Sequence, residues 1–104
     1  MQALRVSFEA ARTTVAVAES EDWHSWYADR LGWLFGPAVE QEFLETRVRL
    51  VWANGEPNRP VEQGRWRARF DDLLADRPER RQPLMELTGQ ARYALVGRFQ
   101  QLSA

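Results

Sequence analysis

The sequence predicts an all-α fold, a small bundle of four to five helices in one domain that covers residues 1–104. Along most of the chain, apolar residues recur at spacings of three and four, the period of a helix with one buried face. Residues 54–60 (NGEPNRP) form the one clear loop, at the middle of the chain. With 44% apolar and 28% charged residues, the composition is that of a globular domain.

Residues 3–18 carry two patterns. Leu4, Phe8, Ala11, Val15 and Ala18 follow helical spacing, whereas the alternation from Leu4 to Ala10 and the β-branched residues after it are typical of strands. Since neither Gly nor Pro interrupts this stretch, we expect a helix, with a β-hairpin as the alternative.

Two helices are predicted between this segment and the central loop. Ser20 is a suitable N-cap for the first, and Gly36 is a suitable end for it. Pro37 fits the first turn of the second helix. The apolar residues of the second helix are Val39, Phe43, Leu44, Val48, Val51 and Trp52.

Two further apolar stripes follow the central loop. The first consists of Trp66, Phe70, Leu73 and Leu74. The last helix is expected over residues 84–102, where apolar residues again recur every three or four positions. The sequence contains no internal repeat.

Charge and cysteine content exclude several classes of function. The net charge of −1 gives no overall field that would attract nucleic acid or an anionic membrane. The absence of Cys excludes disulfides, thiolate metal sites and thiol catalysis. The uncharged run at residues 31–39 is too short for a membrane span, and the N-terminal segment lacks the apolar run of a signal peptide. We therefore expect a cytoplasmic protein with no membrane partner.

Few residues could carry catalysis. Glu21 and His24 have the Glu-x-x-His spacing of metal-binding helical bundles, but such a site needs two pairs and this chain has one His. Glu40, Glu42 and Glu45 fit a solvated helix N-terminus. We predict no catalytic residue, no metal and no cofactor, and a protein that is not an enzyme.

Arginines alternate with aromatic residues from Arg65 to Phe70, a pattern that could track phosphates and stack on bases. Two observations weaken this interpretation. Trp66 and Phe70 fall on a core stripe, and nearby carboxylates would partly neutralise the arginines. A nucleic-acid-binding regulator is therefore the alternative function, and its face would consist of Arg65, Arg67, Arg69, Arg77, Arg80 and Arg81.

The five tryptophans give the stronger signal, because Trp is enriched at interfaces. Trp52 and Trp66 lie on stripes typical of a core, whereas residues 23–35 hold a denser group of aromatic residues. Either the core is unusually aromatic or part of this segment contacts another subunit or protein. The predicted interaction surface consists of Trp23, Trp26, Tyr27, Trp33 and Phe35.

Two resemblances bear on this interpretation. Trp52-Ala53-Asn54-Gly55 near the midpoint resembles the WXG100 secreted helical hairpins, but it has one residue too many between Trp and Gly, and Gly36-Pro37 interrupts the helix that this family requires. The second pattern is similar to that of small helical proteins of unassigned function from GC-rich actinobacteria, which implies a helical fold and no activity. It runs through Trp23, Leu34-Phe35-Gly36, Glu42, Glu45-Thr46-Arg47, Trp66-Arg67, Leu73-Leu74 and Arg77-Pro78.

The surplus of aromatic residues and the lack of reactive groups together favour a non-enzymatic protein–protein interaction or adaptor module. We expect it to form a homo-oligomer through its aromatic surface, to bind another protein, or to do both.

Overall fold

The structure is a computed structural model that describes the backbone of residues 2–52 and 57–103 and the side chains of residues 5–52 and 57–97. Within these ranges the chain forms five α-helices and one 3-10 turn, with no strand. The predicted all-α bundle is confirmed, and residues 3–18 belong to a helix rather than a hairpin. The elements are α1 (Gln2–Ala18), α2 (His24–Phe35), α3 (Pro37–Val51), α4 (Arg59–Asp76), η1 (Pro78–Arg80) and α5 (Arg81–Ser103).

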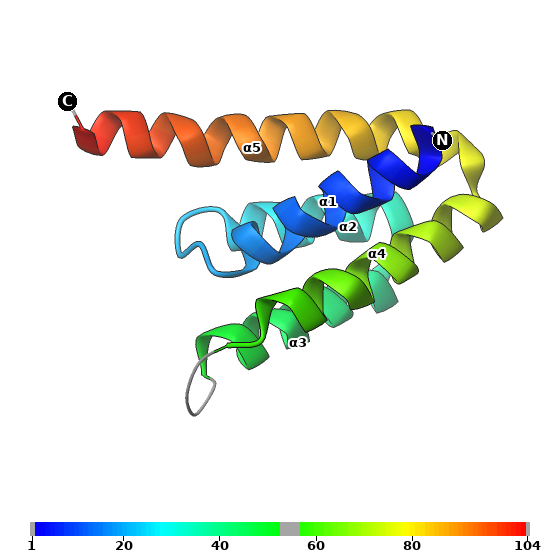
Figure 1. Cartoon of the computed structure of the whole chain (residues 1–104), viewed down its shortest axis with the longest axis horizontal. Coiled ribbons are helices and arrows are strands. Elements are labelled where there is room, and N and C mark those ends of the chain that lie inside the picture. The colour runs from blue at the N-terminus through cyan, green and yellow to red at the C-terminus, as the bar shows by residue number, and fades with distance from the viewer. Residues whose placement is uncertain (1, 53–56, 104) are drawn as a thin grey trace.

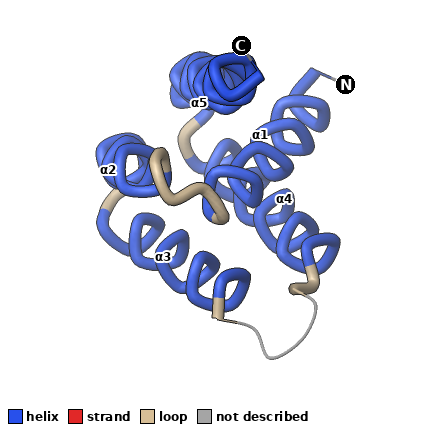
Figure 2. The backbone as a smooth tube through the Cα atoms, turned by 90° about the vertical axis from the view of Figure 1, so that its left-hand side faces the viewer, coloured by secondary structure: helices blue, strands red, loops and turns tan. Residues whose placement is uncertain are grey.

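Helix α1 is the centre of the bundle and contacts all four other α-helices (Figures 1 and 2). Its buried positions are filled by small or β-branched side chains such as Ser7, Ala10, Thr14 and Val17. Small side chains allow neighbouring helices to approach α1 on several sides. A helix that is buried on several sides does not show the single apolar stripe that is typical of a surface helix. This explains why the sequence of residues 3–18 also resembles a strand.

Helix α2 begins at His24, later than the predicted N-cap Ser20, and residues 21–23 form a turn. Ser20 still caps this turn, because its Oγ accepts a hydrogen bond of 3.1 Å from the backbone N–H of Trp23. Arg47 on α3 donates to the carbonyl oxygen of Ala18 at 2.7 Å and thereby satisfies the end of α1.

The junction of α2 and α3 matches the prediction. Gly36 has φ 101° and donates its N–H to the carbonyl oxygen of Gly32 at 2.8 Å, so a left-handed residue ends α2. Pro37 occupies the first turn of α3. The two helices are neighbours in the bundle and contact each other (Figures 1 and 2).

The predicted central loop at residues 54–60 ends earlier than expected, because α4 begins at Arg59. Residues 54–56 lie outside the described ranges, while Arg59 and Pro60 already belong to the first turn of α4. Asn58 caps that helix, because its Oδ1 accepts a hydrogen bond of 3.3 Å from the backbone N–H of Val61.

The buried stripe of α3 differs from the predicted one. The buried residues are Val39, Phe43, Thr46 and Leu50, whereas Val48, Val51 and Trp52 are exposed. The prediction that Trp52 belongs to the core is therefore wrong. The prediction counted only apolar residues, whereas the buried stripe continues through the polar residue Thr46 to Leu50. In the C-terminal half of α3 the predicted stripe therefore lies on the wrong side of the helix.

Candidate interaction surfaces

The aromatic residues of the predicted interaction surface lie mainly inside the bundle. Tyr27 and Phe35 are buried, and Trp23 and Trp26 are half-buried and packed against the core. Only Trp33 points to solvent, with 79% of its surface exposed. A partner that meets the folded chain can therefore contact Trp33 and the open edges of Trp23 and Trp26, but not Tyr27 or Phe35.

The buried aromatic rings form one continuous chain through the core. Tyr27 lies 5.2 Å from Phe43 between ring centroids, and Phe43 lies 6.5 Å from Trp66. Trp66 and Phe70 are 5.3 Å apart, and Phe70 and Phe35 are 6.2 Å apart. These separations are typical of favourable tilted and edge-to-face pairs. The chain joins α2, α3 and α4, so the high aromatic content is explained largely by the core.

Tyr27 is tied to the central helix by its hydroxyl group. The hydroxyl lies 2.7 Å from Thr14 Oγ1, and both side chains are fully buried. Burial raises the pKa of Tyr27 far above its usual value, and the hydrogen bond to Thr14 opposes this only in part. The group therefore stays neutral and serves the packing of α2 against α1.

A second buried polar group joins α3 to α4. Glu62 is buried, and its carboxylate accepts two hydrogen bonds from Arg49, of 2.7 Å from Nε and 2.9 Å from Nη2. This bidentate pair holds the pKa of Glu62 below its usual value, against the opposing effect of burial. Next to it, Thr46 Oγ1 accepts a hydrogen bond of 2.9 Å from Trp66 Nε1. Spacing alone gave no signal for this cluster, since its members lie 13 and 20 residues apart.

The arginines of the alternative nucleic-acid face are distributed over several surfaces. Arg65 and Arg69 line the cleft between α3 and α4, where Arg69 Nε lies 2.9 Å from Glu42 Oε2. Arg67 lies over the ring of Phe8 on α1. Arg77 approaches Asp76 at 3.9 Å. Arg80, at the end of η1, and Arg81, at the start of α5, are half-buried. No single face collects all six, and no observation specifically favours nucleic-acid binding, which stays a prediction.

The acidic and histidine residues considered for metal binding do not converge. His24 Nδ1 lies 2.8 Å from the carbonyl oxygen of Ser20, and Glu42 pairs with Arg69. Among the described residues, no group of three or more His, Asp or Glu side chains has the geometry of a metal site.

The C-terminal end of α3 and the residue that follows it carry a group of exposed apolar side chains. Val48 is 56% exposed, Val51 is 43% exposed and Trp52 is 76% exposed. Val48 and Val51 lie three residues apart on one side of the last turn of α3, and Trp52 is the C-cap residue that directly follows it. We call these three residues the α3 patch. The sequence shows these residues as part of an apolar stripe, but the same spacing is typical of a buried helix face, so the sequence alone does not indicate that they are exposed.

These features define a small all-α domain with an aromatic core and exposed apolar side chains on its outer helices. No family model, no characterised protein and no solved structure matches this chain. Within the described ranges, none of the helices combines the length and the apolar character that a membrane crossing requires. The two resemblances and the cytoplasmic location expected from the sequence stay predictions.

Proposed function

We propose that this chain is a non-enzymatic protein–protein interaction module that self-associates through exposed apolar side chains. The α3 patch carries this proposal. The aromatic chain of the core is complete without Trp52, so the internal packing of the bundle gives no reason for a large apolar residue at that position. Exposed Trp beside branched aliphatic residues is characteristic of contact sites.

The size of the patch sets the expected strength of self-association. Stable protein interfaces bury about 800 Å² on each partner, more than three side chains provide. We therefore expect a weak, concentration-dependent oligomer in which the α3 patch lies at the centre of the contact. Trp33 on α2, the exposed member of the surface predicted from the sequence, is a further exposed aromatic residue outside the α3 patch.

Light scattering coupled to size-exclusion chromatography tests the proposal. The wild-type chain is compared over a wide concentration range with the double variant Val48→Glu/Trp52→Ala. Tyr93→Ala is the matched control, because Tyr93 is also an exposed aromatic residue but lies on α5. We expect the mass of the wild type and of the control to rise with concentration and that of the double variant to stay monomeric. A wild-type chain that remains monomeric at millimolar concentration would contradict the proposal.

A further inference from the structure

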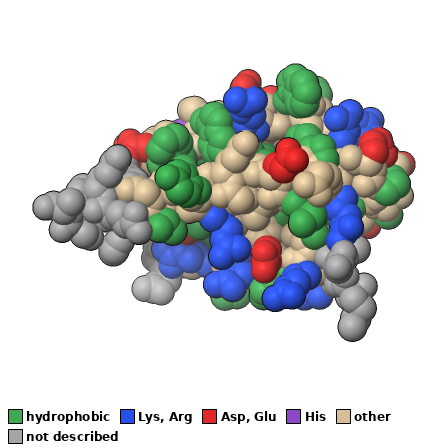
Figure 3. Space-filling model, turned by 90° about the horizontal axis from the view of Figure 1, so that it is seen from above, with side chains coloured by type: hydrophobic (Ala, Val, Ile, Leu, Met, Phe, Trp, Pro, Cys, Tyr) green, Lys and Arg blue, Asp and Glu red, His purple; other side chains and the backbone are tan. Residues whose placement is uncertain are grey.

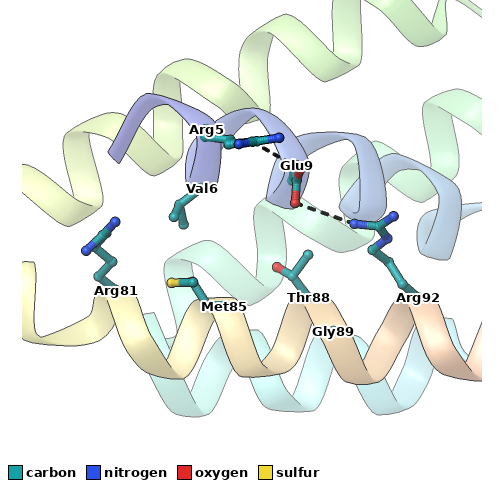
Figure 4. A pocket seen from close by; sticks show the side chains of 8 residues that line it. All are labelled: Arg5, Val6, Glu9, Arg81, Met85, Thr88, Gly89 and Arg92. Carbon is teal, nitrogen blue, oxygen red and sulfur yellow. Dashed lines mark hydrogen bonds and ion pairs between the residues drawn. The ribbon is translucent and has the colours of Figure 1, made fainter. Parts of the chain in front are cut away.

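A groove runs between α1 and α5, on a different part of the molecule from the α3 patch. Its first section is a cavity of about 460 Å³ (Figure 4). A second section of about 370 Å³ adjoins it between the same two helices, where Gln63 of α4 also lines it. Glu9 and Arg92 line both sections, so the two cavities adjoin at the ion pair that these residues form between α1 and α5 (Figure 4).

The shape of the groove suits a long, narrow occupant. The residues that line it on α5 extend from Arg81 to Val96 and recur every three or four positions, so they occupy one side of that helix. This stretch is about 22 Å long at the rise of an α-helix. Helices α1 and α5 run in the same direction along it (Figure 1). A helix of about fifteen residues would fill such a length.

The charge of the groove is positive. Arg5 and Arg92 share the carboxylate of Glu9, at 3.8 Å and 3.4 Å. Arg12, which lines the second section, lies over the ring of Phe8. Arg81, at the start of α5, also lines the first section. Seen from the α5 side, basic side chains gather along one border of the molecule (lower edge of Figure 3). An occupant with acidic side chains would complement this excess of positive charge.

The floor of the groove contains a buried hydroxyl group without a hydrogen-bond partner and apolar side chains. Thr88 is only 6% exposed and points from α5 toward α1, yet its Oγ1 has no hydrogen-bond partner among the described residues (Figure 4). A buried hydroxyl group without a partner destabilises a fold. Beside it, Val6 and Met85 point toward each other across the groove and supply apolar contact surface (Figure 4).

Gly89 gives a second indication at the same place. A Cβ atom built on Gly89 would meet no described atom within 4 Å, so packing inside this chain does not require glycine there. Glycine in the middle of a helix is less stable than alanine by about 1 kcal/mol. The missing side chain leaves room for another backbone to come close to α5.

We propose that this groove binds an amphipathic, acidic helix of a partner protein. The apolar stripe of that helix lies on Val6, Met85 and Val96, and its carboxylates pair with Arg5, Arg12 and Arg92. Helix-in-groove binding of this kind is a recurrent mode of peptide recognition. The proposal does not depend on self-association through the α3 patch, because the two surfaces share no residue.

A display library of helical peptides of about fifteen residues, selected on the intact chain, tests the proposal. Selected peptides are then titrated by fluorescence anisotropy against the wild type and against Gly89→Leu and Arg92→Glu. Arg30→Glu is the matched control, since Arg30 is an exposed arginine on α2. Circular dichroism confirms that each variant is folded.

We expect the enriched peptides to combine apolar residues at helical spacing with Glu or Asp. Their affinity should fall by about tenfold or more with Gly89→Leu and with Arg92→Glu and stay unchanged with Arg30→Glu, a difference of about 1.4 kcal/mol. Enrichment of neutral or basic peptides would overturn the proposal, as would equal binding to the Gly89→Leu variant. Binding to anionic lipid vesicles without any selected acidic peptide would assign the groove to a membrane surface instead. Loss of self-association in the groove variants without peptide binding would assign it to a second copy of the chain.

Discussion

The indole N–H of Trp66 donates a hydrogen bond of 2.9 Å to Thr46 Oγ1, and this contact joins α4 to α3 inside the core. Thr46 in turn donates to the carbonyl oxygen of Glu42 at 2.9 Å. Both side chains are buried, so water cannot replace either bond at low cost. The contact explains how a polar residue takes a place in the buried stripe of α3.

Thr46→Val keeps the shape of the side chain but leaves Trp66 Nε1 without its acceptor. We expect the free energy of unfolding to fall by about 1–3 kcal/mol, the range for a buried polar group that loses its partner. Urea denaturation measures this. In a Trp66→Phe background the donor is absent, so the same substitution should be clearly less destabilising. An equal loss in both backgrounds would contradict the assigned hydrogen bond.

Glu62 should make the stability of the fold depend on pH. Since Arg49 lowers the pKa of Glu62 in the folded state, the pair stabilises the fold above the ordinary carboxyl pKa. This stabilisation is lost as the pH falls through the lowered pKa. Because Arg49 is partly exposed to solvent, we expect a difference of only about 1 kcal/mol between the wild type and Glu62→Gln at neutral pH. Denaturation from pH 7 into the acid range should show this difference shrinking, and a difference that grows with acidity would contradict the account.

Truncation of Trp66 should destabilise the fold far more than truncation of Trp33. Trp66 is buried in the aromatic chain, so Trp66→Ala should reduce the free energy of unfolding by about 3–5 kcal/mol. Trp33 is mostly exposed, so Trp33→Ala should change it by no more than about 0.5 kcal/mol. Chemical denaturation followed by circular dichroism compares the two variants. A large loss with Trp33→Ala would mean that this side chain supports the fold rather than a surface.

Gly36 and Gly64 offer a matched pair of substitutions to alanine. Gly36 has φ 101° and ψ 171°, a backbone conformation that essentially only glycine adopts, so Gly36→Ala should destabilise the fold by about 1–3 kcal/mol. Gly64 lies within α4, and a Cβ there would meet no described atom within 4 Å. Gly64→Ala should therefore stabilise the fold by up to about 1 kcal/mol. Thermal melts of both variants would contradict this assignment if the two shifts had the same sign.

The helical fold could be predicted because its local signals agree with one another. Gly36 followed by Pro37 marks the junction of α2 and α3, and the spacing of Trp66, Phe70 and Leu74 marks the buried side of α4. The sequence predicts the start of α2 too early. Glu21 and Asp22 are typical of the first turn of a helix, but they lie in the turn that Ser20 caps, and the helix begins at His24.

The surfaces could be predicted less well, because periodicity does not reveal which side of a helix is covered. Val48, Val51 and Trp52 have the spacing of a core stripe, yet they are exposed, since α3 turns Thr46 and Leu50 toward its neighbours. In the same way, the density of aromatic residues in positions 23–35 predicts an exposed surface, yet Tyr27 and Phe35 are buried in the core, where their rings pack against Phe43 and Phe70. The groove between α1 and α5 depends on residues about 80 positions apart in the chain, such as Glu9 and Arg92, and local spacing carries no signal for such a pair.

The five indole N–H signals in a two-dimensional ¹H–¹⁵N NMR spectrum test the central proposal most directly, because each tryptophan reports separately. Spectra are recorded from dilute to concentrated protein. If the chain self-associates through the α3 patch, the signal of Trp52 shifts or broadens with concentration while that of the buried Trp66 stays in place. A Trp52 signal that does not change up to millimolar concentration would contradict self-association through this patch.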